Sequence, residues 1–169
     1  MVRPLGLPFD PIARAGESWE QRFGPAAAMR AATSVFRVQQ ILLARFDEAL
    51  RPHALTFARY EVLVLLTFSR TGELPLKVIG SRLMVHPTSV TNAIDRLVAA
   101  GYVRRRPNPE DGRGVLAGIT DEGRAVVQTA TKALTDLDFG LGDLSENDRE
   151  TLFDVLRRVR LGAGDVDGR

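Results

Sequence analysis

Short polar side chains and arginines follow one another closely in the middle of the chain. Thr88, Ser89, Thr91 and Asn92 stand close together, and three consecutive arginines occupy 104–106. Hydroxyl and amide groups can hydrogen-bond the edges of DNA bases, and an asparagine can pair with adenine through two hydrogen bonds. Arginines bind phosphates. These residue types predict contact with nucleic acid, although the same polar residues would also suit an ordinary helix start.

The basic residues are concentrated in the same region. Residues 77–113 contain seven basic and three acidic side chains, a net charge of +4, whereas the whole chain carries +2. The rest of the chain is therefore slightly acidic. A local basic patch of this kind is typical of a nucleic-acid-binding face, and a solvated charged surface would give the same count.

The sequence offers little for catalysis or metal binding. It contains no cysteine, and its two histidines, His53 and His86, have no metal-ligand spacing. No nucleophile, base and acid stand in a recognisable pattern, so we predict no enzyme, no catalytic residues, no metal site and no cofactor. No apolar run approaches the roughly 18 residues of a membrane span, which predicts a cytoplasmic protein without a membrane partner.

Helices are predicted before this region. Residues 10–23 and 25–50 have helical apolar spacing, with Pro25 expected in the first turn of the second helix. Thr56 is expected to cap the next helix. The apolar run Val62–Leu66 predicts that this helix is buried on most sides.

The polar residues and the arginines belong to the elements that follow. A short helix is expected over 74–84, and a further helix begins at Pro87 and ends before Gly101. Strands are expected over 102–106 and 115–119, joined by the turn-forming sequence PNPEDGRG. The predicted buried face of the helix from Pro87 consists of Val90, Ile94, Leu97 and Val98.

Two more helices are predicted towards the C-terminal end. Thr120 is expected to cap one that continues to about Phe139, and Ser145 opens one that reaches about residue 161. The apolar stripe of this last helix includes Leu152, Leu156 and Val159. The ends, residues 1–9 and 162–169, are rich in Gly, Pro and Asp and are expected to be disordered tails.

Three helices followed by a hairpin are typical of a winged helix-turn-helix. Four segments in this order also resemble the MarR family of bacterial transcription regulators, named for multiple antibiotic resistance. They are LTFARYEVLVLL, HPTSVTNAIDRLVAAGYVRRR, the wing turn NPEDGRG and ITDEGR, which together span residues 55–124.

The resemblance implies a mainly α fold, a winged helix-turn-helix with a two-stranded β-wing and N- and C-terminal dimerisation helices. On this basis, residues 10–50 form the N-terminal dimerisation helices, 55–120 the winged-helix DNA-binding domain and 121–161 the C-terminal dimerisation helices. The resemblance also implies a homodimer that binds double-stranded DNA at a palindromic operator, and we expect a ligand-responsive repressor.

DNA contacts are predicted on two helices and on the wing. The resemblance assigns Arg113 to the wing tip, where an arginine reaches into the minor groove, and Asp111 to holding that arginine in place. Because side chains alternate along a strand, at least one arginine of 104–106 must point away from the DNA. The predicted DNA-binding residues are Lys77, Ser81, Thr88, Ser89, Thr91, Asn92, Arg96, Arg104, Arg106, Asp111 and Arg113.

A small anionic or aromatic effector is a further prediction. Some MarR relatives that respond to organic acids carry an extra N-terminal helix with a tryptophan, and Trp19 resembles that residue in position. Arg59 and Arg70 are candidate anion partners. Two other functions stay open: a winged-helix module that binds protein, and a DNA binder without a ligand. The protein-binding module would tolerate loss of Arg113 and show no salt-dependent DNA binding.

Overall fold

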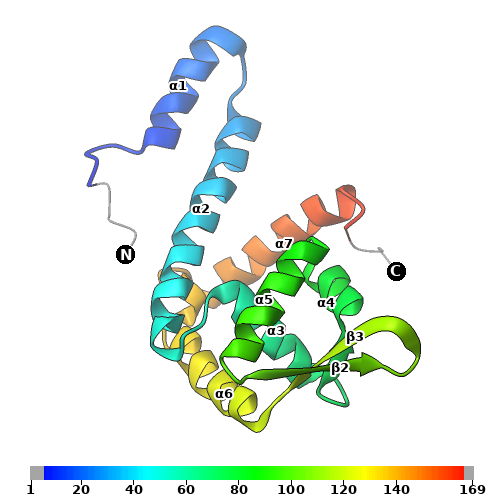
Figure 1. Cartoon of the computed structure of the whole chain (residues 1–169). Helices are drawn as coiled ribbons and strands as arrows, with labels where there is room; N and C mark the ends of the chain where they lie inside the picture. The colour runs from blue at the N-terminus through cyan, green and yellow to red at the C-terminus, as the bar shows by residue number, and fades with distance from the viewer. Residues whose placement is uncertain (1–5, 166–169) are drawn as a thin grey trace.

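The structure is a computed structural model that describes residues 6–165, apart from the side chains of Gly112 and Arg113. Within these residues, seven α-helices and one three-stranded sheet follow the element order of a winged helix with helical extensions at both ends (Figure 1). The predicted mainly α winged-helix fold is confirmed.

The two N-terminal helices are α1 (Pro11–Phe23) and α2 (Ala27–Leu50). They form a hairpin that projects from the rest of the molecule (Figure 1). Gly24 turns the chain with a φ of 98°, and Pro25 precedes α2, so its predicted place in the first turn of that helix is wrong. Of the residues in α2, only Phe46 and Leu50 near its C-terminal end are buried.

The next helix, α3 (Phe57–Phe68), follows a short 3₁₀ turn at Arg51–His53. Thr56 occupies the N-cap position as predicted, but its hydroxyl accepts a hydrogen bond from Arg59 Nε (3.1 Å) and caps no backbone group. The first N–H of α3 donates instead to the Asp47 carboxylate (2.7 Å). The start of α3 is therefore fixed by a residue of α2.

A strand and two helices come next: β1 (Glu73–Pro75), α4 (Leu76–Leu83) and α5 (Pro87–Ala99). The helix predicted over 74–84 therefore begins too early, because Leu74 pairs with Ala117 in the sheet. Met84 has a φ of 55°, and this left-handed conformation ends α4 and turns the chain towards α5.

The wing belongs to a three-stranded antiparallel sheet. Its hairpin consists of β2 (Val103–Asn108) and β3 (Asp111–Ile119). The predicted two-stranded wing is this hairpin, and β1 adds a third strand that was not predicted: it pairs with the other side of β3, so the order is β1-β3-β2. Both hairpin strands are longer than predicted, since Asn108 still pairs with Asp111 beside the turn.

The two C-terminal helices are α6 (Asp121–Thr135) and α7 (Glu146–Gly162). Thr120 and Ser145 cap them as predicted, accepting hydrogen bonds from the N–H groups of Gly123 (3.0 Å) and Asp148 (3.2 Å). The predicted end of α6 at about Phe139 is wrong. Phe139 lies in a separate 3₁₀ turn with a φ of 49°, which an α-helix does not contain.

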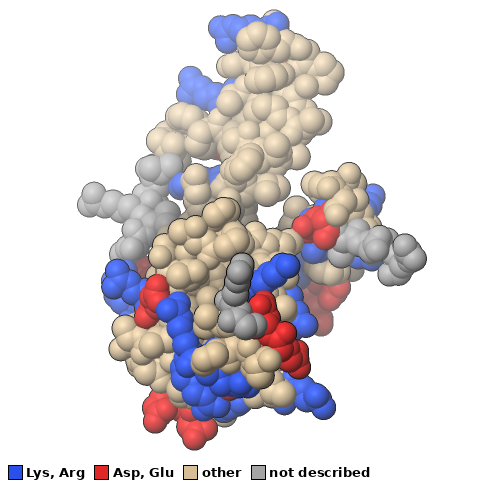
Figure 2. Space-filling view, turned by 45° about the vertical axis from the view of Figure 1, so that its right-hand side comes forward, with Lys and Arg blue, Asp and Glu red and all other residues tan. Residues whose placement is uncertain are grey.

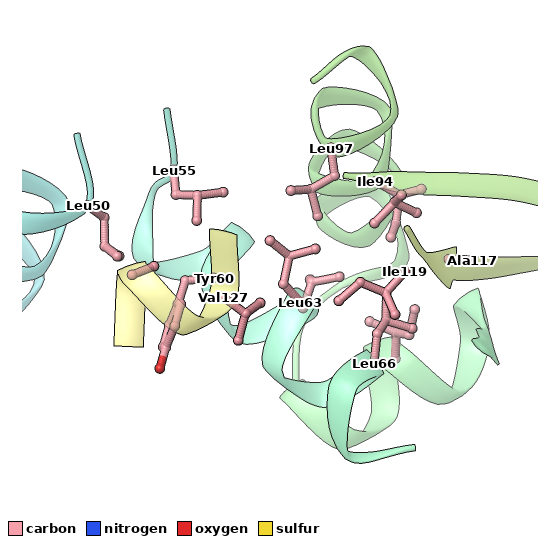
Figure 3. Packing of buried hydrophobic residues seen from close by; sticks show 14 of the residues in the cluster. Leu50, Leu55, Tyr60, Leu63, Leu66, Ile94, Leu97, Ala117, Ile119 and Val127 are labelled. Atoms are coloured by element: carbon pink, nitrogen blue, oxygen red, sulfur yellow. The ribbon is translucent and has the colours of Figure 1, made fainter. Parts of the chain in front are cut away.

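The core lies where α3, α5 and the sheet meet (Figure 3). Val98 faces away from it and is 38% exposed, so its predicted burial is wrong, whereas the burial predicted for Val90 is confirmed. One side of α5 is thus held by the core while the other is left to solvent. The central members of this cluster are Leu63, Leu66, Ile94, Leu97 and Ile119.

Candidate nucleic-acid interface

The solvent-facing side of α5 is polar. Thr88, Ser89, Thr91, Asn92 and Arg96 are all exposed, and the opposite side of the helix is buried. The structure therefore brings all five predicted residues of this helix onto one surface, which we call the α5 face.

The start of α5 is set by two residues. His86 is the N-cap, and its Nδ1 accepts a hydrogen bond from the Thr88 N–H (3.3 Å), so an imidazole takes the place of the usual hydroxyl or carboxylate. Pro87 is the first residue of the helix, as predicted. A helix N-terminus also carries partial positive charge, which favours a nearby phosphate.

Asn92 and Thr91 differ in what they can offer a partner. Among the described residues none hydrogen-bonds the Asn92 amide, which borders a shallow hollow together with Asp95, Arg96 and Ala99. The Thr91 hydroxyl donates to the Pro87 carbonyl (3.1 Å), so only its acceptor sites are left. Asn92 is accordingly the better candidate for a base contact, since it retains both its donor and its acceptor.

Two predicted residues come from α4. Lys77 and Ser81 are exposed and border a hollow of about 450 Å³ between α4 and α5, with Thr91 on its other side. The Ser81 hydroxyl donates to the Val78 carbonyl (3.0 Å). The structure therefore places an ammonium group and a hydroxyl of α4 beside the start of the α5 face.

The three consecutive arginines of β2 divide between the two sides of the sheet. Arg105 points towards α5, where its Nη1 lies 2.5 Å from Asp95 and its Nη2 donates to the Thr91 carbonyl (3.3 Å). Arg104 and Arg106 lie on the opposite side and both donate to the Glu73 carboxylate. Each arginine thus has an acidic partner, and basic and acidic side chains lie side by side on this part of the surface (Figure 2).

Glu73 has a perturbed titration because of these contacts. The hydrogen bond from Arg106 lowers the pKa of Glu73, and the further hydrogen bond from Arg104 and the charges of both arginines outweigh the opposing effect of burial. The same contact raises the pKa of Arg106. The carboxylate is therefore ionised at neutral pH. Sequence reasoning missed Glu73 because its strand was not predicted: Leu74 and Pro75 were taken as the start of a helix, and Glu73 was left before it.

The wing tip is tightly folded. A Cβ atom on Gly114 would lie 3.0 Å from Asp111 Oδ2, so the Asp111 carboxylate bends back over the start of β3. Arg113, predicted to enter the minor groove, lies within β3, but its side chain is outside the described part of the structure. Its role stays a prediction.

The predicted effector residues are not brought together within one chain. Trp19 lies on α1, where its ring contacts Phe23 (5.0 Å between centroids), and α1 is at the end of α2 remote from α3 (Figure 1). Arg59 is on α3 and hydrogen-bonds Thr56, and Arg70 is exposed just after α3. A site that used Trp19 and either arginine would need residues from a second copy of the chain.

Neither a metal site nor a membrane-spanning helix is found among the described residues. Between residues 6 and 165, no group of three or more His, Cys, Asp or Glu side chains is arranged to hold a metal ion. In the same range, every helix is too short or too polar to cross a bilayer.

Comparison with known proteins agrees with this arrangement. A family model described as MarR family matches residues 57–115, from the start of α3 into β3. Sco5413, a MarR family transcriptional regulator from Streptomyces coelicolor, is 56% identical, with 83% of this chain and 97% of that chain covered and a TM-score of 0.78. Sco3205, a MarR family regulator from the same organism solved in complex with DNA, is 25% identical, with 83% and 90% covered and a TM-score of 0.75.

A curated relative gives the same result over a shorter range. The HTH-type transcriptional regulator TtmR of Methylorubrum extorquens is 33% identical over 115 residues, which is 68% of this chain and 57% of TtmR. The chain thus spans little more than half the length of this relative. MarR family proteins are transcriptional regulators and not enzymes. From the fold, the matching segments and the extensive identity with Sco5413, we conclude that the chain belongs to the MarR family of transcriptional regulators.

Proposed function

We propose that the protein is a homodimeric regulator that binds a palindromic operator, with α5 entering the major groove and the wing following the adjacent minor groove. The observation that carries this proposal is the α5 face, where exposed polar side chains surround a helix N-terminus. A helix presented in this way fits the width of the major groove. The DNA complex of Sco3205 supports the same use of the fold here.

In this proposal, residues 55–120 bind DNA and residues 10–50 and 121–161 form the dimer. The support is a nearly wholly apolar groove of about 470 Å³ between α2 and α7. Other apolar side chains of the same two helices are also exposed, including Phe36 and Val159, each 67% exposed. Exposed apolar surface of this kind is typical of a protein interface. The groove is bordered by Val35, Val38, Leu42, Leu43, Leu152 and Leu156.

A second copy is the occupant that we infer for this groove. Two-fold symmetry would present two α5 helices, and a palindrome has the same symmetry. The two helices would then lie about 34–36 Å apart to enter successive major grooves. Because a bound regulator of this kind covers the DNA it recognises, we propose that it acts as a repressor.

DNA binding is expected to depend steeply on salt and to lose specificity when Asn92 is replaced by Ala. Each phosphate contact lowers log affinity by about 0.9 per unit of log salt concentration. Loss of a base contact costs about 1–3 kcal/mol on the recognised sequence and little on random DNA. The measurement is binding of parent and Asn92→Ala protein to the duplex upstream of the gene and to a random duplex of equal length, across a salt series.

The same measurement separates the alternatives. Equal losses on both duplexes would make Asn92 a phosphate contact. Absence of salt-dependent binding by the parent protein would remove the proposed function and favour a winged-helix module that binds another protein.

We further propose that a small anionic or aromatic effector lowers operator affinity. A compound that binds between the dimer helices and the DNA-binding domain would change the spacing of the two α5 helices, and by linkage operator DNA would weaken its binding by the same factor. Trp19, which is 40% exposed, is the only tryptophan and serves as the reporter, with Arg59 and Arg70 as candidate anion partners. We expect an organic acid or phenol to quench tryptophan fluorescence and release operator DNA at matching concentrations. Quenching without release would exclude this coupling, and no response to any compound would favour a ligand-independent regulator.

A further inference from the structure

Glu73 reaches across the wing sheet to two arginines. In the sheet, Glu73 pairs with Gly118 of β3, and Gly118 pairs with Arg104 of β2, so the three residues form one row. Glu73 Oε1 accepts a hydrogen bond from Arg104 Nη2 (3.2 Å). Glu73 Oε2 accepts two from Arg106, from Nε (3.0 Å) and Nη2 (2.5 Å). Both oxygens of one carboxylate are therefore used by different guanidinium groups.

Gly118 makes this crossing possible. A Cβ atom on Gly118 would lie 2.9 Å from both Cγ and Oε1 of Glu73, which is closer than ordinary contact. The φ of Gly118 is not positive, so a side chain is excluded here by lack of space and not by backbone conformation. The carboxylate thus lies directly over the middle strand, and its side chain is only 13% exposed.

The contact uses the part of Arg106 that would bind DNA. Nε and one Nη form the edge through which arginine grips a carboxylate or a phosphate with two hydrogen bonds. That edge of Arg106 is occupied by Glu73. A phosphate could take it only by displacing the carboxylate, and a poorly exposed carboxylate without its donors is costly.

We propose that Glu73 is an internal competitor for DNA phosphates, a specificity-determining residue that withholds Arg104 and Arg106 from sequence-independent binding. Affinity then depends more on the α5 face and less on the charge of the wing. This inference rests on the proposed DNA-binding function. It also revises the sequence-based expectation that both arginines are DNA contacts.

The test is Glu73→Gln, compared with Glu110→Gln. Both substitutions remove one negative charge from the wing region, but Glu110 lies in the hairpin turn and forms no ion pair with a described residue. We expect Glu73→Gln to bind a random duplex about 3- to 10-fold more tightly than Glu110→Gln does, because released arginines add phosphate contacts. Two new contacts per chain would steepen the slope of log affinity against log salt by about 1.8 for each chain, or about 3.6 for the dimer. The preference for the upstream duplex over the random one should fall.

A second substitution keeps the inference testable if Glu73→Gln does not fold. In the parent protein, Arg106→Gln should change affinity for the random duplex less than twofold, whereas in the Glu73→Gln background it should cancel much of the gain. Equal behaviour of Glu73→Gln and Glu110→Gln would overturn the proposal. So would weaker binding to both duplexes, which would make Glu73 a positioning residue for the arginines. If the parent protein binds neither duplex, it is the proposed function that fails.

Discussion

Replacing Leu156 by Glu is expected to separate the proposed dimer and to lower operator affinity by at least about 100-fold. Leu156 lies on α7 and borders the apolar groove opposite Val38 and Leu42 of α2. A carboxylate in a groove that a second copy covers would lose its water without gaining a partner. Each separated chain would then bind one half-site alone, and the increase in affinity that comes from linking two DNA-binding domains would be lost.

Sedimentation velocity and operator binding, measured on the same preparation, check this expectation. Thr151→Glu is the matched control, because it adds the same charge at an exposed position of the same helix. We expect the control to remain dimeric and to bind DNA like the parent. A Leu156→Glu protein that sediments as a dimer with parental affinity would show that the groove between α2 and α7 is not the interface.

Replacing Gly123 by Ala is expected to reduce the free energy of unfolding by about 3 kcal/mol. A Cβ atom at this position would lie 2.2 Å from the Tyr102 carbonyl oxygen and 2.9 Å from Ile119 Cγ1. The Tyr102 carbonyl is itself held by the Thr120 N–H (3.0 Å), so it cannot move without breaking the start of α6. The helix propensity that alanine gains over glycine, about 1 kcal/mol, is too small to compensate.

Urea unfolding at one fixed protein concentration measures this effect, since the stability of a dimer depends on concentration. Gly162→Ala is the control, because nothing lies within 4 Å of the position of its Cβ atom at the end of α7. We expect the control to be neutral or slightly stabilising. Equal stability of the two variants would mean that the contact between Tyr102 and the start of α6 is looser than described.

Local signals predicted the helices where caps and apolar spacing agree. Thr120 and Ser145 each accept the expected backbone hydrogen bond, and α5 begins at Pro87 as predicted. The end of α6 was missed because no glycine or proline lies between Thr135 and Phe139, although the backbone is left-handed at both Asp138 and Phe139. Sequence reasoning is reliable where a residue interacts with its own neighbours in the chain.

The first strand shows where such reasoning fails. The helix predicted from the spacing of Leu76 and Ile79 was extended back to Leu74, but Leu74 pairs with Ala117, far away in the sequence. One local signal was available, because Leu74 precedes Pro75 and a residue before proline disfavours helical backbone. Because β1 was not predicted, the position of Glu73 beside the wing arginines was not predicted either.

Only part of the candidate site could be predicted from the sequence. The residues of the α5 face were found, because a polar face opposite a buried one is visible in the sequence. The division of the three wing arginines between Glu73 and Asp95 was not found, since it depends on strand pairing and on the depth of each acidic side chain.

The length of α2 has a mechanical consequence. It is a single helix of 24 residues, held in the core only near Phe46 and Leu50, so it is about 36 Å long and anchored at one end. Within one chain, the anchored end beside the winged helix is the point about which α2 would rotate. A tilt of about 5° at that point would move the far end of α2 by about 3 Å. Conversely, a displacement of about 3 Å at the α1 end would rotate α2 by about 5° relative to the DNA-binding domain.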